Sequence, residues 1–228
     1  MSILHPKLIL VCFKRKETNM FLNENEIIGM SLTEKPLIVG FVDKEIKHWM
    51  NGSEEVKVVS YGLTQNSYDI RLGRGVELFA QYPITDIPLC DPLAKPRTVD
   101  IDKPHMLPRK EETHYTEEDS VTLTYYDIPP NAFVLARSEE SFNIPANVTG
   151  FLYCKSTYAR LGMNMTPTVL KSGWSGQLVL EIFNQSPYVL RIYEGQGIGT
   201  LYFAQHDAAS NSPYDGKYQG QVGITHAL

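Results

Sequence analysis

A cluster of cations and hydroxyls, formed by Lys155, Ser156, Thr157 and Arg160, carries the side chains that phosphate oxygens prefer. Its first three members stand where the strand FLYC leads into a short helical turn, and N–H groups at a helix start also attract anions. A Lys-Ser-Thr run is equally typical of an ordinary helix cap. On a helix Lys155 and Arg160 point apart, so Arg160 is free to face the pocket of an adjacent subunit.

Glu181 stands alone as an acid in the strand QLVLEIFN, where it shares a face with Val179 and Phe183. Apolar neighbours favour the neutral form of a carboxyl, so we expect the pKa of Glu181 to be raised, which suits proton transfer near neutral pH. The alternative is a salt-bridged strand glutamate. Asp69 in NSYDIRLG is likewise compatible with a functional or a structural role, and we assign it a structural role.

Short strands are expected to position these side chains. After Asp127 the chain is rich in β-branched and aromatic residues and is broken by Pro, Asn or Gly at short intervals. This pattern predicts an antiparallel barrel or jelly-roll-like fold with one short helix around residues 157–161. The tail SPYDGKYQGQVGITHAL is either a frayed terminus or a mobile lid that closes over a ligand.

The N-terminal half offers fewer leads to chemistry. LILVCF is a candidate strand and LNENEII a candidate short helix. DKEIKHWMNG predicts a helix that Asp43 caps and Gly52 ends. Residues 80–120, rich in Pro, Asp, Lys and Glu, predict a long surface excursion with at most one short strand, and its histidines, His105 and His114, are expected to be solvated.

The chain of 228 residues, with a formal net charge of −5, is long enough for one large β domain. The negative charge argues against a broad surface for nucleic acid or an anionic membrane. Three cysteines form no CxxC pair, so a disulfide scaffold is not expected and a cytoplasmic location fits. The apolar runs are much shorter than the roughly 20 residues that a spanning helix needs.

Several common catalytic motifs are absent from the sequence. No histidine is followed by x-Glu and no two cysteines lie close together, so the zinc deaminase signature is missing. There is no G-x-x-x-x-G-K-[ST] phosphate loop and no G-x-S-x-G elbow, and GQGIGT departs from the dinucleotide fingerprint. Most familiar enzyme chemistries are therefore disfavoured.

Six segments in a fixed order resemble the dCTP deaminases of the dUTPase-like superfamily. The similarity covers residues 41–225, although it is loose between residues 80 and 120. Any one segment alone would be a weak signal, whereas six in the order of the family are a specific one. The segments are DKEIKHWMNG, SYGLTQNSYDIRLG, IPPNAFVLARS, KSTYARLG, GWSGQLVLEIFN and GKYQGQVGIT.

The resemblance implies a dUTPase-like β-barrel of the jelly-roll type, assembled as a homotrimer with active sites between subunits. It implies deamination of dCTP to dUTP and ammonia without zinc or any other protein-bound catalytic metal, with Mg²⁺ accompanying the triphosphate and dTTP as an inhibitor. The expected catalytic residues are Glu181 as acid/base, Arg160 from the adjacent subunit, and Ser156. The expected substrate-binding residues are Lys155, Ser156, Thr157, Thr168, Tyr214, Lys217, Tyr218 and Gln221.

The same resemblance divides the chain into an extension of unknown role (residues 1–38), the deaminase barrel (39–212) and a C-terminal lid (213–228). Relatives that hydrolyse dUTP carry an Asp just before the segment that here reads LKSGW, where this chain has Lys171 and Ser172. We therefore expect deamination without hydrolysis of the triphosphate. The alternatives are a bifunctional deaminase–diphosphatase that gives dUMP and pyrophosphate, and a non-catalytic nucleotide-sensing protein.

Overall fold

The computed structural model describes residues 20–79, 105–115 and 120–226. The expected strand LILVCF, Cys12 and Cys90 lie outside these residues. Strands dominate the described part of the chain, which confirms the prediction of a mainly β fold. The elements in chain order are α1 (Glu24–Ser31), β1 (Ile38–Val39), β2 (Ile46–Asn51), β3 (Glu54–Leu63), β4 (Tyr68–Leu78), β5 (His105–Met106), β6 (Lys110–Tyr115), β7 (Ser120–Ile128), β8 (Phe133–Asn143), β9 (Val148–Cys154), α2 (Ser156–Ala159), β10 (Met163–Met165), β11 (Thr168–Leu170), β12 (Ser175–Asn184), β13 (Leu190–Tyr193) and β14 (Gly197–Gln205).

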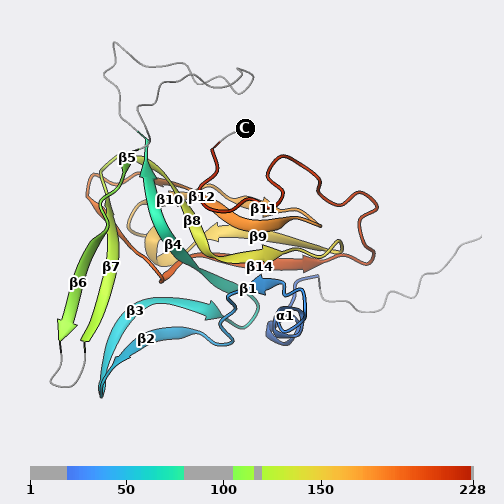
Figure 1. The fold of residues 1–228 in the computed structure, drawn as a ribbon, viewed down its shortest axis with the longest axis horizontal. Helices are drawn as coiled ribbons and strands as arrows, with labels where there is room; N and C mark the ends of the chain where they lie inside the picture. The colour runs from blue at the N-terminus through green and yellow to red at the C-terminus, as the bar shows by residue number, and fades with distance from the viewer. Residues whose placement is uncertain (1–19, 80–104, 116–119, 227–228) are drawn as a thin grey trace, which may run out of the picture.

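Most strands join one antiparallel sheet with the order β10-β12-β8-β4-β14-β9-β11 (Figure 1). Its two end strands, β10 and β11, are separated in the chain by Thr166 and Pro167 alone. Three backbone steps span at most about 11 Å, so the sheet has to curl until its ends come together. The backbone N–H of Thr166 extends the contact by donating to the Glu181 carbonyl at 3.0 Å. This curling places β11 close to the middle of β12.

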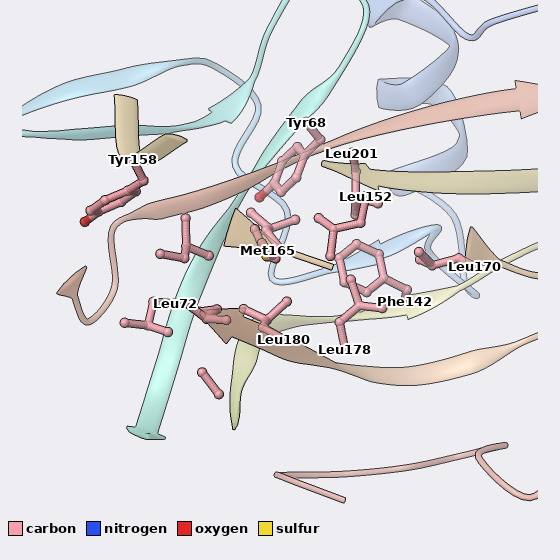
Figure 2. Close-up of a cluster of buried hydrophobic side chains, with 14 of the residues drawn as sticks. Tyr68, Leu72, Phe142, Leu152, Tyr158, Met165, Leu170, Leu178, Leu180 and Leu201 are labelled. Carbon is pink, nitrogen blue, oxygen red and sulfur yellow. The ribbon is translucent and has the colours of Figure 1, made fainter. Parts of the chain in front are cut away.

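Apolar side chains from the strands fill the interior of the curled sheet. Tyr68 and Leu72 from β4, Leu180 from β12 and Leu201 from β14 are all fully buried, and Figure 2 shows them converging in one cluster. Each such burial stabilises the fold by roughly 1.5–3 kcal/mol. The core is therefore built from β4, β12 and β14 together, which are also the strands that carry Asp69, Glu181 and their neighbours.

The strand β12 alternates between two environments as its sequence predicts. Its even-numbered residues from Leu178 to Ile182 are buried, whereas Glu181 and its neighbours on the same face are only partly buried. Since successive strand side chains point to opposite faces, Glu181 is directed away from the apolar core.

The described residues before residue 39 pack on the main sheet. Asn23 caps α1 in a capping box with Glu26, which confirms the short helix expected in LNENEII. Ile27 from α1 is fully buried, and β1 pairs with β8 through Ile38 and Phe142. No helix in the described ranges is both long and apolar enough to cross a bilayer.

The helix expected in DKEIKHWMNG is wrong, because this segment forms the strand β2. Gly52 and Ser53 make the turn of a hairpin in which Asn51 faces Glu54 and Trp49 faces Val56 across the β2–β3 ladder. Gly52 has a φ of 60°, the left-handed conformation that tight hairpin turns require. The Gly-Ser pair was therefore a hairpin signal, and Gly52 does not mark the end of a helix. Figure 1 shows this hairpin projecting from the body beside β6 and β7.

A second sheet of three strands, with the order β13-β7-β6, lies beside the main one. Its strand β6 falls in the segment that was expected to hold at most one short strand, yet residues 105–115 hold both β5 and β6. His114 therefore lies on a strand rather than in a loop. The short helix expected at residues 157–161 is confirmed as α2, which begins at Ser156.

Candidate functional site

A cavity of about 950 Å³ opens between β11, β12 and the C-terminal segment, residues 213–226. This volume is within the range of pockets that hold small molecules. Its walls combine apolar side chains of the sheet with polar groups of β11 and of the C-terminal segment. The lining residues are Leu78, Phe79, Phe133, Leu135, Thr168, Val169, Leu170, Lys171, Trp174, Leu178, Val179, Glu181, Tyr214, Gly216, Lys217, Tyr218, Gln221, Thr225 and His226.

Glu181 is the acid that lines this cavity from β12. Its Oε2 atom is buried and has no hydrogen-bond partner within the described part of the chain. Burial raises the pKa of the Glu181 carboxyl, against the opposing effects of its own backbone and of a hydrogen bond from Thr168. The expected rise in pKa is confirmed in direction. An unpaired acceptor in a partly dry cavity is costly unless a ligand or water meets it, so it marks a site for chemistry.

The C-terminal segment is bonded to the start of β12. The backbone N–H of Gln177 donates to the Gln221 carbonyl at 2.9 Å, and Gln221 Nε2 donates to the Gln177 carbonyl at 2.8 Å. The Trp174 indole donates to the Tyr218 carbonyl at 2.9 Å. Gly176 is required at this crossing, because a Cβ there would lie 2.8 Å from the Gln221 carbonyl oxygen. These bonds favour the lid interpretation over a frayed terminus.

The far end of the same segment contacts β4. His226 Nε2 lies 2.8 Å from an oxygen of Glu77, and the His226 ring lies 6.3 Å from that of Phe79, centroid to centroid. Residues 213–226 are thus attached at both ends of the cavity.

The cluster around α2 lies elsewhere in the subunit. Ser156, Thr157 and Arg160 are exposed, and none of them lines the cavity that holds Glu181. Lys155 is buried, and its ammonium forms an ion pair with Asp69, whose second oxygen accepts from Thr200 Oγ1 at 2.6 Å. Asp69 therefore has the structural role that we assigned to it.

The ten expected site residues fall into two groups. Within one subunit, the structure does not bring Lys155–Thr157 to the cavity that Glu181 lines. The six residues at the cavity are Thr168, Glu181, Tyr214, Lys217, Tyr218 and Gln221, and the four around α2 are Lys155, Ser156, Thr157 and Arg160.

Two residues at or beside the cavity were not among the expected site residues. Gln177 is buried and fixes the C-terminal segment, since its Oε1 also accepts from the Gly223 N–H at 2.8 Å. The sequence feature that could have indicated Gln177 is its polar amide at the start of an otherwise apolar strand. Lys171 lines both this cavity and an adjoining hollow of about 570 Å³, with its ammonium 5.6 Å from the centroid of the Tyr214 ring. The sequence pointed to Lys171 only as a position that lacks a carboxylate, and its place in the cavity is what makes it a candidate ligand.

Metal-ligating side chains do not gather at the cavity. Across the ranges 20–79, 105–115 and 120–226, no three His, Cys, Asp or Glu side chains are close enough together to hold an ion.

A family model described as dCTP deaminase-like matches residues 41–206. This span exceeds half of the 228 residues. The chain belongs to the dCTP deaminase-like family. The family resemblance of the six segments is thereby confirmed, and the match contains β12 with Glu181 and α2 with Arg160 but ends before the C-terminal segment.

Curated relatives of this dCTP deaminase-like chain extend the match over most of its length. It is 33% identical over 209 residues to the dCTP deaminase of Chlamydia trachomatis serovar L2, a match that covers 90% of this chain and 98% of the relative. It is 34% identical over 194 residues to the dCTP deaminase of Chloroflexus aggregans, covering 84% of this chain and 89% of the relative.

Solved structures give a looser likeness to this dCTP deaminase-like chain. The 2′-deoxycytidine 5′-triphosphate deaminase of Agrobacterium tumefaciens shares 16% identity at a TM-score of 0.46, covering 81% of this chain and 47% of that one. The native EIAV dUTPase shares 21% identity at a TM-score of 0.34, covering 49% of this chain and 98% of that one. The family assignment therefore rests on the sequence matches.

Proposed function

We propose that this protein deaminates dCTP to dUTP and ammonia. The observation that carries the proposal is the Glu181 carboxyl, which lines a cavity with one oxygen buried and unpaired. The names of the relatives, dCTP deaminase in both cases, indicate the substrate. A non-catalytic nucleotide sensor has no chemical use for such a carboxyl, whose raised pKa suits proton transfer near neutral pH.

The walls of the cavity suit a nucleoside triphosphate. Trp174 and Leu178 offer apolar surface for the base and sugar, and Thr168 stands beside Glu181 at the position proposed for the reacting ring. Lys171 and Lys217 bring positive charge for the phosphates. Mg²⁺ belongs to the substrate in this proposal and is held by the oxygens of the triphosphate.

The proposed reaction moves protons through Glu181. The ionised carboxylate removes a proton from a water molecule as the oxygen of that water bonds to C4 of the cytosine, and Glu181 then passes this proton to N3. As the C4–N4 bond breaks, Glu181 takes the proton of the new C4 hydroxyl and passes it to the departing nitrogen, which leaves as ammonia. The carbonyl at C4 completes dUTP, and the carboxylate is ready for another cycle.

The remaining groups are proposed to come from a second subunit of a homotrimer. Ser156, Thr157 and Arg160 are exposed on α2 and lie outside the cavity of their own chain, so a neighbouring copy is a natural source for them. Their hydroxyls and guanidinium would contact the reacting water and the phosphates. The C-terminal segment, with Tyr214, Tyr218 and Gln221, would close over the triphosphate.

The proposed product is dUTP rather than dUMP. Lys171 and Ser172 occupy the place at which the hydrolysing relatives carry a carboxylate base. The Ser172 hydroxyl already donates to the Val148 carbonyl at 2.8 Å, and a lysine ammonium cannot accept a proton from water. We place the enzyme in the cytoplasm, where it would supply dUTP for thymidylate synthesis, and dTTP is the inhibitor that we propose to test.

Incubation of the purified protein with dCTP and Mg²⁺ tests the proposal. We expect equal amounts of dUTP and ammonia and no pyrophosphate, measured by chromatography and coupled assays. Glu181→Gln is expected to lower kcat by at least about 10³-fold, since it removes the proton acceptor but keeps the shape. Normal turnover by Glu181→Gln would falsify this mechanism, and pyrophosphate release from the wild type would favour the bifunctional alternative.

A further inference from the structure

Lys155, one of the expected phosphate ligands, has its ammonium in the interior of the protein. Its side chain is 10% exposed and that of its partner Asp69 is 7% exposed. The second oxygen of Asp69 accepts a hydrogen bond from Thr200 Oγ1. A buried lysine that is paired in this way has its charge neutralised before any phosphate arrives.

The three residues join three neighbouring strands at one corner of the sheet. Asp69 on β4 and Thr200 on β14 face each other directly in the ladder. Lys155 follows the last residue of β9, Cys154, which pairs with Gly199 of β14. The network therefore links β4, β14 and the end of β9 at the point where the chain leaves the sheet and enters α2.

Lys155 is also fixed through its backbone. Its N–H donates to the Ile198 carbonyl at 3.3 Å, and its own carbonyl accepts from the N–H groups of Tyr158 and Ala159 at 3.0 Å each. Lys155 is the N-cap of α2, although its side chain makes no capping bond. The position of α2 thus depends on one residue that is held by β4 and β14 at once.

We infer that Lys155 is a positioning residue that acts through Asp69 and Thr200, and that it does not bind the triphosphate. This inference rests on the proposed function. The network fixes α2, from which Ser156 and Arg160 are presented to the reacting substrate in the neighbouring subunit. A displacement of a catalytic group by a fraction of an ångström lowers the rate of the chemical step more than it lowers substrate affinity.

Kinetics of Asp69→Asn and Lys155→Met distinguish positioning from phosphate binding. We expect both to lower kcat by about tenfold or more while the KM for dCTP changes by less than about threefold, and Lys155→Arg to restore most of kcat. If Lys155 bound phosphate, Asp69→Asn would release its ammonium and leave kcat intact with an equal or lower KM. Lys155→Met would then raise KM, and by more for dCTP than for dCMP. Either result would overturn the inference.

A matched control separates positioning from general loss of stability. Asp127 accepts hydrogen bonds from Arg191 and Lys110 in the sheet β13-β7-β6, outside the network of Asp69, Lys155 and Thr200. Asp127→Asn should lower the Tm, as Asp69→Asn does, with kcat unchanged. Thr200→Val, which removes a single hydroxyl, replaces Lys155→Met if that variant does not fold.

Hydrogen exchange tests the inference independently of turnover. The Ala159 and Arg160 amides, which bond within α2, should exchange faster in Asp69→Asn than in Asp127→Asn. Equal exchange in the two variants would show that the ion pair does not fix α2. If the wild type fails to deaminate dCTP while α2 still loosens in Asp69→Asn, the proposed function falls and the positioning role of the pair stands.

Discussion

Two charged residues, Lys155 and Glu181, differ in whether their charged groups have a partner within the subunit. Lys155 is buried against a carboxylate, so its charge is satisfied within the subunit. Glu181 is placed in a cavity with one oxygen unpaired. A satisfied charge contributes to structure, whereas an unsatisfied one is available to a substrate. We therefore interpret Lys155, which resembled a ligand, as structural, and we propose the lone strand acid, Glu181, as the reactive group.

The raised pKa of Glu181 predicts how stability depends on pH. Its carboxyl binds a proton more tightly in the folded than in the unfolded chain, so its contribution to stability is lost as pH rises through the raised value. We expect Glu181→Gln to be more stable than the wild type at pH 8 by about 1 kcal/mol, or roughly 2–4 °C in Tm. The difference should shrink towards acid pH.

Thermal unfolding of both proteins at several pH values measures this effect. The values should run from about 4, near the ordinary pKa of a carboxyl group, to about 8. Glu34→Gln, at an exposed position, is the control and should shift stability by less than about 0.5 kcal/mol at any pH. A variant Glu181→Gln that is less stable than the wild type at pH 8 would show that the carboxyl is well solvated or paired.

Among the elements, the C-terminal segment depends most on contacts far along the chain. It runs beside β12 at the bridge between Gly176 and Gln221, and its further bonds include those to Trp174 and Gln177. Hydrogen bonds of this kind contribute about 1 kcal/mol each, so the segment can open without unfolding the sheet.

Gln221→Ala is expected to weaken the closed state of this segment. It removes the bond from Nε2 to the Gln177 carbonyl, and we expect the KM for dCTP to rise about fivefold to tenfold. Trypsin should cut after Lys217 faster than in the wild type. Val222→Ala, at a neighbouring side chain that is 79% exposed, is the control and should leave both measurements unchanged. Unchanged KM and proteolysis in Gln221→Ala would argue against a role in closure.

At the scale of the whole molecule, one subunit holds both groups of site residues but keeps them apart. Thr168, Glu181 and the C-terminal segment line the cavity, whereas Ser156 and Arg160 are exposed on α2. We propose that a closed ring of identical subunits brings the two groups together, which requires no change in the fold of one chain.

Mixing two inactive variants tests this arrangement. Glu181→Gln lacks the cavity acid and Arg160→Ala lacks the α2 cation, so a site between one copy of each can be complete. After refolding from an equal mixture, we expect up to about a quarter of wild-type activity, the share of complete sites in random trimers. Mass measurement in solution should give three subunits. No recovery in verified mixed trimers would mean that both residues act in one chain.

The sequence by itself determined the features that depend on local pattern. The alternation of QLVLEIFN placed Glu181 on one strand face with Val179 and Phe183 and predicted the rise in its pKa, because strand periodicity and apolar neighbours depend on adjacent residues. The short helix α2, the mainly β fold and the family were likewise accessible from composition and ordered motifs.

The tertiary structure alone decided which distant residues meet. Lys155 pairs with Asp69 across 86 positions, and Thr200 reaches the same carboxylate across 131. The strand β2, mistaken for a helix, forms because the Gly52–Ser53 turn lets it pair along β3. Local propensities are small and nearly balanced, whereas the long-range pairing of strands settles both the conformation of a segment and the partner of each buried charge.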